Sequence, residues 1–409
     1  MRLRWTVIVV SFASVVLFAC TPDLTGTGGP SLIDAVSVVG DTGTAGSGTS
    51  PVGSQTLPTA QTQNAPTTLS GSVAASGDYR LFDAGAGTTG DEWIVKPAAG
   101  SDTSFLVVLF DADHELLRRE LVSPRTTLEH VVRTATPTIY VGVAPANGSG
   151  GGDFSFVVTQ RAGVAIPAPA QQVVWLNFAG GSDVRVQARS GISFPALDAA
   201  VVNPQYAGQS AMLKSAIVAA MREDYAAYNV VILSSDEGPV PGGPHATIQF
   251  GGDDPRLLGL ADNVDQYNAD PGQTAMVYVE AFADYKTMEL SADEMGQMIG
   301  NTASHELGHL LGLFHTQKPV DIMDTTGSAW DLATDQSFTT GSLEPSVFPT
   351  GSENSPARLA ETVGEKAGPK EKGVTKPLSP EMMLRKASLR ALMRNELRSR
   401  CGTCLDPDG

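Results

Sequence analysis

The chain has 409 residues, of which 42% are hydrophobic and 17% are charged, and this is enough for two domains that each have a core. Its formal net charge of -17 excludes nucleic acid as a general partner, because binding a phosphate backbone requires a basic surface.

The first part of the chain, residues 1–19, is typical of an export signal. Arg2 and Arg4 form a basic start, and the apolar stretch 6–19 is too short to span a bilayer. The sequence L-F-A-C that ends at Cys20 resembles the bacterial lipobox, in which the cysteine carries a lipid. This resemblance implies a lipoprotein of the bacterial cell envelope, held at the outer membrane or cell surface through Cys20. The alternative is ordinary secretion.

Residues 20–66 are rich in Gly, Ser, Thr, Pro, Ala and Gln, a composition that predicts a disordered tether. From 67 to 161, short apolar stretches alternate with clusters of Gly, Asp, Asn and Pro, and this predicts an all-β sandwich. The stretches are 79–82, 93–95, 105–110, 128–132, 139–143 and 154–158. Their order, with G-D-Y-R-L-F, L-V-V-L-F-D, I-Y-V-G-V and G-D-F-S-F-V-V, resembles the bacterial pre-peptidase C-terminal domain, a β-sandwich often attached to secreted proteases.

A short Pro-containing linker, 162–170, precedes a mixed series that predicts an α/β (α+β) domain over 171–340 with one mixed sheet. We expect strands at 173–178, 230–233, 246–250, 258–264 and 275–279. Helices are expected over 209–228 and from the N-cap Ser291 to Leu311. The predicted fold is therefore multidomain, with an all-β sandwich followed by this domain.

The C-terminal part has a different composition. Residues 341–376 are predicted to be a linker, and 377–409 a basic helix and tail. The helix would contact a membrane surface or dock on the acidic domain of its own chain, and we favour docking. Whether Cys401 and Cys404 form a small disulfide stays open.

Three of the six histidines lie within the motif H-E-x-x-H-x-x-G-x-x-H. His305 and His309 are four residues apart, so on a helix both project from one face and can hold one metal ion. Glu306 is offset from that face but can reach a water beside the ion. Gly312 permits a sharp turn that ends the helix, and the turn brings His315 back as the third ligand. The motif predicts one catalytic zinc ion, with Glu306 as general base.

The motif resembles that of the metzincin zinc peptidases, and Met323, eight residues after His315, matches their methionine turn. The short spacing is similar to that of matrixin-type members. The resemblance implies that an edge strand above the zinc binds substrate, here Gly259, Leu260 and Ala261. It also implies that a residue after the methionine turn, here Trp330, lines the pocket beyond the scissile bond.

The resulting hypothesis is a zinc-dependent endopeptidase that cleaves extracellular or envelope proteins. A non-catalytic adhesion or scaffold lipoprotein that keeps zinc for stability is the alternative, although structural zinc needs no general base such as Glu306. A zinc hydrolase acting on other carbonyls is a third interpretation. Acidic stretches at 251–254 and 262–270 could supply oxygens to Ca²⁺, and a solvated acidic loop is the preferred interpretation. The protein substrate and the oligomeric state stay open.

Overall fold

The computed structural model describes residues 55–56, 67–74, 78–101, 103–146, 151–187 and 189–366. Residues 1–19, Cys20, most of the predicted tether, and the basic C-terminal segment with Cys401 and Cys404 lie outside the described residues. In the part that is described, no helix is both long and apolar enough to cross a membrane.

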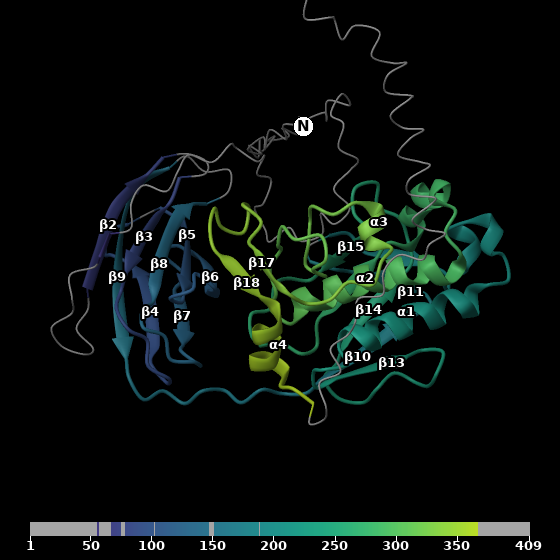
Figure 1. Ribbon diagram of the computed structural model, residues 1–409, viewed down its shortest axis with the longest axis horizontal. Coiled ribbons are helices and arrows are strands. Elements are labelled where there is room, and N and C mark those ends of the chain that lie inside the picture. The colour runs from purple at the N-terminus through teal and green to yellow at the C-terminus, as the bar shows by residue number, and fades with distance from the viewer. Residues whose placement is uncertain are drawn as a thin grey trace, which may run out of the picture. The chain divides into compact units, whose positions relative to one another are not determined.

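The all-β part consists of two sheets with a shared apolar core (Figure 1). One sheet has the strand order β2-β9-β4-β7, and the other has the order β1-β3-β8-β5-β6. The strands are β1 Gln55–Thr56, β2 Thr67–Val73, β3 Arg80–Asp83, β4 Glu92–Pro97, β5 Phe105–Phe110, β6 Leu116–Val122, β7 Leu128–Val131, β8 Tyr140–Pro145 and β9 Gly152–Arg161. Strand β1 corrects the tether prediction for its two residues, because it pairs in parallel with β3.

Strand β5 explains why this part of the chain has two cores. Its sequence F-L-V-V-L-F is buried throughout, and successive side chains of a strand point to opposite faces. Phe105, Val107 and Leu109 pack between the two sheets. The alternate residues, among them Val108 and Phe110, belong to a second cluster on the outer face of the sheet.

The α/β part contains a five-stranded sheet with the order β13-β10-β14-β16-β15. The first four strands run parallel to one another, and β15 at the edge is antiparallel to β16. Two short strands, β11 and β12, form a separate hairpin. The elements are β10 Gln172–Asn177, β11 Gly181–Val184, β12 Ile192–Phe194, η1 Ala199–Val201, η2 Pro204–Tyr206, α1 Ser210–Asp224, β13 Val230–Ser234, β14 Ala246–Phe250, β15 Gly259–Ala261, β16 Thr274–Val277, η3 Val279–Met288, α2 Ala292–Leu310 and α3 Ala329–Leu332. The mixed sheet and both long helices were predicted, although β15 is shorter than expected.

Helix α2 is well defined at its start and lies close to α1 (Figure 1). Ser291 and Glu294 form a capping box, in which each side chain binds a backbone N–H of the other residue. A Cβ added to Gly296 would lie 2.4 Å from the Ala216 Cβ of α1, so the two helices approach through a glycine. Most of α2 is consequently buried, including its histidine-bearing end.

The linker prediction for 341–376 is wrong over the residues that the structure describes. Strand β17 (Thr340–Ser342) pairs with β18 (Ser352–Asn354), and α4 (Ser355–Val363) follows directly. Phe348 and Leu359 are fully buried, so this segment is part of the folded protein.

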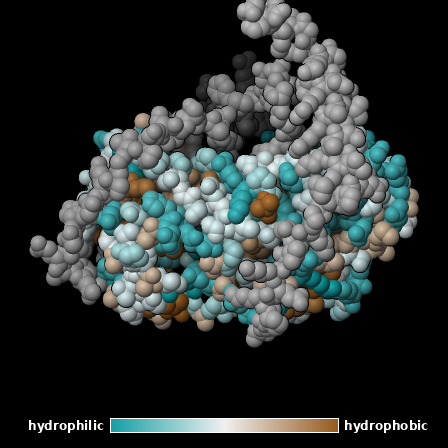
Figure 2. Space-filling model, in the orientation of Figure 1, coloured by the Kyte–Doolittle hydropathy of each residue, from teal (hydrophilic) through white to brown (hydrophobic). Residues whose placement is uncertain are grey.

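The face of the molecule that Figure 2 shows is mostly hydrophilic, with hydrophobic residues scattered singly or in small groups.

Candidate metal centre

Three imidazole rings converge at the C-terminal end of α2. The His309 Nε2 atom lies 3.0 Å from Nε2 of His305 and 3.1 Å from Nε2 of His315. His305 and His309 come from the helix, and His315 comes from the loop that follows it. All three are buried, and their nitrogen atoms are close enough together to ligate one ion. The motif therefore brings its three predicted ligands to one point.

Hydrogen bonds on the outer nitrogen fix the orientation of two of these rings. His305 Nδ1 lies 2.7 Å from the Ile322 carbonyl oxygen, and His309 Nδ1 lies 2.8 Å from the Leu313 carbonyl oxygen. A carbonyl can only accept, so both Nδ1 atoms carry the proton and both Nε2 lone pairs face inward. Burial lowers the pKa of His305 to about 4 and that of His309 and His315 well below the ordinary value. The rings are thus neutral at pH 7, which is the form that binds a metal.

Two glycines shape the end of α2 and the turn that leads from His309 to His315. Gly312 has φ of 89°, and a Cβ there would lie 2.7 Å from Gln266 Cα. Both the left-handed backbone and the close neighbour require glycine, as predicted for the residue that ends the helix. A Cβ on Gly308 would lie 2.5 Å from the Met323 sulfur, so the methionine packs directly against the helix. Met323 also accepts a 2.8 Å hydrogen bond from the backbone N–H of Thr316, next to the third histidine.

Glu306 lies beside the histidines with a fully buried carboxylate. Among the described residues, neither of its oxygens has a well-formed hydrogen bond. Burial raises the pKa of Glu306 well above its ordinary value, and the backbone of Ala261 opposes part of that rise. A Cβ on Gly259 would lie 2.4 Å from Glu306 Oε1, so β15 passes directly alongside this carboxylate. A buried acid with so few polar contacts among the described residues, next to three converging imidazoles, indicates a site built for a further group.

Strand β15 presents backbone groups of two residues on its outer edge. Leu258 and Asp262 bond to Tyr278 and Thr274 on the inner side, at 2.8 and 3.0 Å. Antiparallel pairing alternates, so Gly259 and Ala261 direct their N–H and C=O groups outward.

Gln187, which sequence analysis did not single out, reaches this edge and donates from Nε2 to the Ala261 carbonyl at 2.9 Å. Its own backbone N–H donates to the carboxylate of Asp262 at 2.9 Å. A loop glutamine carries no signal in the sequence that predicts such a contact.

The side chains of the two other residues predicted to bind substrate pack in apolar clusters. Leu260 is fully buried and points into a small cluster with Phe194 and Tyr278. Trp330 lies half-buried on α3 and packs on the core of the α/β part.

Two of the carboxylates proposed for Ca²⁺ have other partners. Asp262 accepts from the backbone of Gln187 and Thr274, and Asp265 accepts from that of Ala269 and Asp270. Across the described ranges, the three histidines are the one group of metal-binding side chains that converges.

The histidine cluster fits a zinc ion by its donor set. Three neutral imidazole nitrogens are a recurrent ligand set for catalytic zinc and leave a fourth position open. The Nδ1 hydrogen bonds to carbonyl oxygens are the usual outer contacts of metal-binding histidines. The cluster can therefore bind a metal ion.

No protein-family model matches the chain, and no curated protein sequence matches it. Weak structural neighbours exist among solved structures. The pre-peptidase C-terminal domain of a Bacillus anthracis collagenase is 15% identical, with 28% of this chain and 99% of that chain covered and a TM-score of 0.19. The Pseudomonas aeruginosa protein IMPa, described as a metallopeptidase and solved in complex with an O-glycopeptide, is 12% identical, with 64% of this chain and 32% of that chain covered and a TM-score of 0.19. These TM-scores are too low to support a function, which therefore rests on the residues of the site.

Proposed function

We propose that the chain is a zinc-dependent endopeptidase of the metzincin type. The observation that carries this proposal is the convergence of His305, His309 and His315 beside the buried carboxylate of Glu306, which has no well-formed hydrogen bond to any described residue. A site that held zinc only for stability would have no use for an unpaired acid, whose burial is costly. The edge of β15 beside Glu306 would bind the substrate backbone as an added strand.

Each part of the site would have its own role in peptide hydrolysis. When bound, zinc supplies Lewis-acid activation of water and of the scissile carbonyl. Glu306 would accept the proton of the attacking water and deliver it to the leaving amine. Burial raises the pKa of Glu306, and a more basic carboxylate holds the proton more firmly between its removal from water and its delivery to the amine. Gly259 would hold the substrate main chain through its outward backbone groups, and Gln187 would have to release the Ala261 carbonyl before that group could join.

The location of the protein is also a proposal. The lipobox-like sequence at Cys20 supports a lipid anchor in the bacterial cell envelope. An exported peptidase there would meet extracellular or envelope proteins as substrates. The side chain of Trp330 is proposed to line the pocket beyond the scissile bond.

The test is cleavage of an unfolded protein by the full chain, before and after zinc is removed with a chelator. Glu306→Gln keeps the shape of the side chain but removes the base. Glu280→Gln, at an exposed position of η3, is the matched control. We expect cleavage by the wild type and the control, loss of cleavage with chelator, and an inert Glu306→Gln protein that still binds zinc. If the wild type binds zinc but cleaves no substrate, the alternative of a non-catalytic zinc lipoprotein is favoured.

A further inference from the structure

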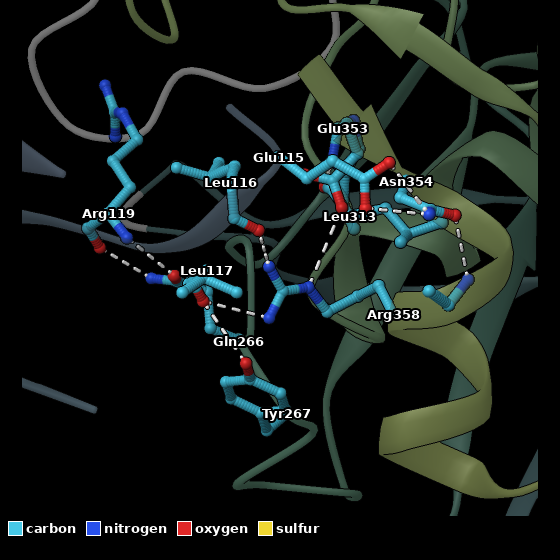
Figure 3. Close-up of polar contacts among 12 residues, drawn as sticks. Glu115, Leu116, Leu117, Arg119, Gln266, Tyr267, Leu313, Glu353, Asn354 and Arg358 are labelled. Carbon is cyan, nitrogen blue, oxygen red and sulfur yellow. Dashed lines mark hydrogen bonds and ion pairs between the residues drawn. The ribbon is translucent and has the colours of Figure 1, made fainter. Parts of the chain in front are cut away.

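Strand β6 is the edge strand of its sheet, and residues of the α/β part satisfy its outer backbone groups. Gln266 acts on it much as a neighbouring strand would (Figure 3). Its Oε1 accepts from the Arg119 backbone N–H at 2.9 Å, and its Nε2 donates to the Arg119 carbonyl at 2.7 Å. Proteins often protect an edge strand by covering it with a loop, and Gln266 does so here by pairing with both backbone groups of Arg119.

Arg358 of α4 extends the same contact along β6 (Figure 3). Its guanidinium donates to the carbonyls of Leu116 and Leu117, the latter at 3.0 Å. The Tyr267 hydroxyl also donates to the Leu117 carbonyl, at 3.2 Å. Arg358 is buried, and its Nε lies 3.7 Å from the buried carboxylate of Glu353. A buried charge is costly unless it is paired and hydrogen-bonded, and the partners of Arg358 meet both needs. These contacts therefore hold α4 against β6.

The loop that pairs with β6 also supports the turn between the second and third histidines. A Cβ on Gly312 would meet Gln266 Cα at 2.7 Å and the Asp265 carbonyl oxygen at 2.9 Å. The Asp265 backbone N–H donates to the carbonyl of His309 at 2.9 Å. One side of this loop therefore touches the metal-binding turn, and the other side touches the β-sandwich.

A second path joins the same strand to the third histidine. Phe314, which directly precedes His315, packs in a cluster with sandwich residues such as Val108 and Phe110. The guanidinium carbon of Arg119 lies 5.6 Å from the centre of the Phe314 ring. Arg119 also donates from Nε to the Val347 carbonyl at 2.9 Å.

We propose that the β-sandwich is a structural part of the metal centre, and that Arg119 and Gln266 are positioning residues for His315. His305 and His309 lie on a rigid helix, whereas His315 lies on a loop whose outer neighbours come from β6 and from the segment docked on it. Without those neighbours, the third ligand would lose its fixed position. This inference deepens the proposed function, since it assumes that the three histidines bind zinc.

The test measures the zinc dissociation constant of the full chain by competition with a chromophoric chelator. Gln266→Leu removes both hydrogen bonds to β6, and Arg119→Met removes the guanidinium while keeping an apolar stem. Arg125→Ala removes an exposed arginine from the turn between β6 and β7 and serves as the control. We expect the first two variants to bind zinc about tenfold or more weakly, as for other outer contacts of a metal site.

Thermal unfolding of each zinc-free variant separates positioning from general loss of structure. The expected result is weaker zinc binding by variants that are still folded at the temperature of the titration. Arg119→Met keeps every backbone hydrogen bond of β6, so it supplies the answer if Gln266→Leu does not fold. Wild-type affinity in a folded Arg119→Met protein would overturn the inference and leave the proposed function intact. A wild-type chain that binds no zinc would overturn both.

Discussion

Replacing Gly259 by alanine should impair Glu306, the proposed general base, without weakening the proposed zinc site. The added Cβ would lie 2.4 Å from Glu306 Oε1 and 2.7 Å from Glu306 Cγ. Ordinary contacts of a Cβ begin at 3.4 Å, so the carboxylate or the strand must move by about 1 Å. A misplacement of that size in a catalytic group costs about 10²-fold in rate. The three histidines are untouched, so zinc binding should be unchanged.

The assay is kcat/KM for cleavage of an unfolded protein, measured with the zinc content of each sample. Gly238→Ala is the matched control, because nothing lies within 4 Å of its added Cβ. We expect about a 10²-fold loss for Gly259→Ala and almost none for Gly238→Ala. Activity of Gly259→Ala equal to that of the control would refute the contact between β15 and Glu306. Loss of zinc from Gly259→Ala would refute the claim that base and metal are separable.

Three further predictions concern stability. Gly312→Ala should lower the free energy of unfolding by at least about 1–2 kcal/mol, because φ is 89° there and Gln266 blocks the Cβ; a denaturant midpoint equal to that of Gly242→Ala, an open position, would contradict this. Removing the metal should lower the melting temperature, since zinc at 100 times its Kd contributes about 2.7 kcal/mol; a chelator-independent melting temperature would contradict it. Burial raises the pKa of Glu353 from 4.5 to about 7, against the opposing charge of Arg358. A carboxyl group whose pKa is raised by folding costs stability as pH rises from about 4.5 to 7. Glu353→Gln should therefore flatten the pH dependence of urea unfolding in that window, and parallel wild-type and variant curves would oppose it.

The sequence predicts the convergence of the three histidines because the motif is local. The spacing of His305 and His309 needs only a helix, and Gly312 indicates where that helix ends. Positions of this kind depend on neighbours within a few residues, and the structure brings all three histidines together. Apolar stretches likewise predicted most strands of the all-β part and of the five-stranded sheet in the α/β part. They include β5, which is buried on both faces.

The elements that the sequence did not predict are those whose burial depends on distant partners. Strand β6 contains three consecutive charged residues, Arg118, Arg119 and Glu120. They interrupt the apolar pattern by which a strand is predicted from sequence, so this strand was missed. The segment that contains β18 and α4 resembled a linker because its composition is polar. Its helix is fixed by Arg358, which bonds to carbonyls more than 200 residues earlier in the chain. Long-range hydrogen bonds of this kind leave no periodic pattern in the sequence.

The most direct test is the number of zinc ions bound per full chain, measured by equilibrium dialysis and elemental analysis for the wild type and His309→Ala. His309 lies between the other two ligands, at 3.0 and 3.1 Å from their Nε2 atoms, so its loss should destroy the site. We predict one zinc ion for the wild type and none for the variant. A wild-type chain without zinc, or a variant that keeps its ion, would contradict the assignment of these histidines as a metal centre.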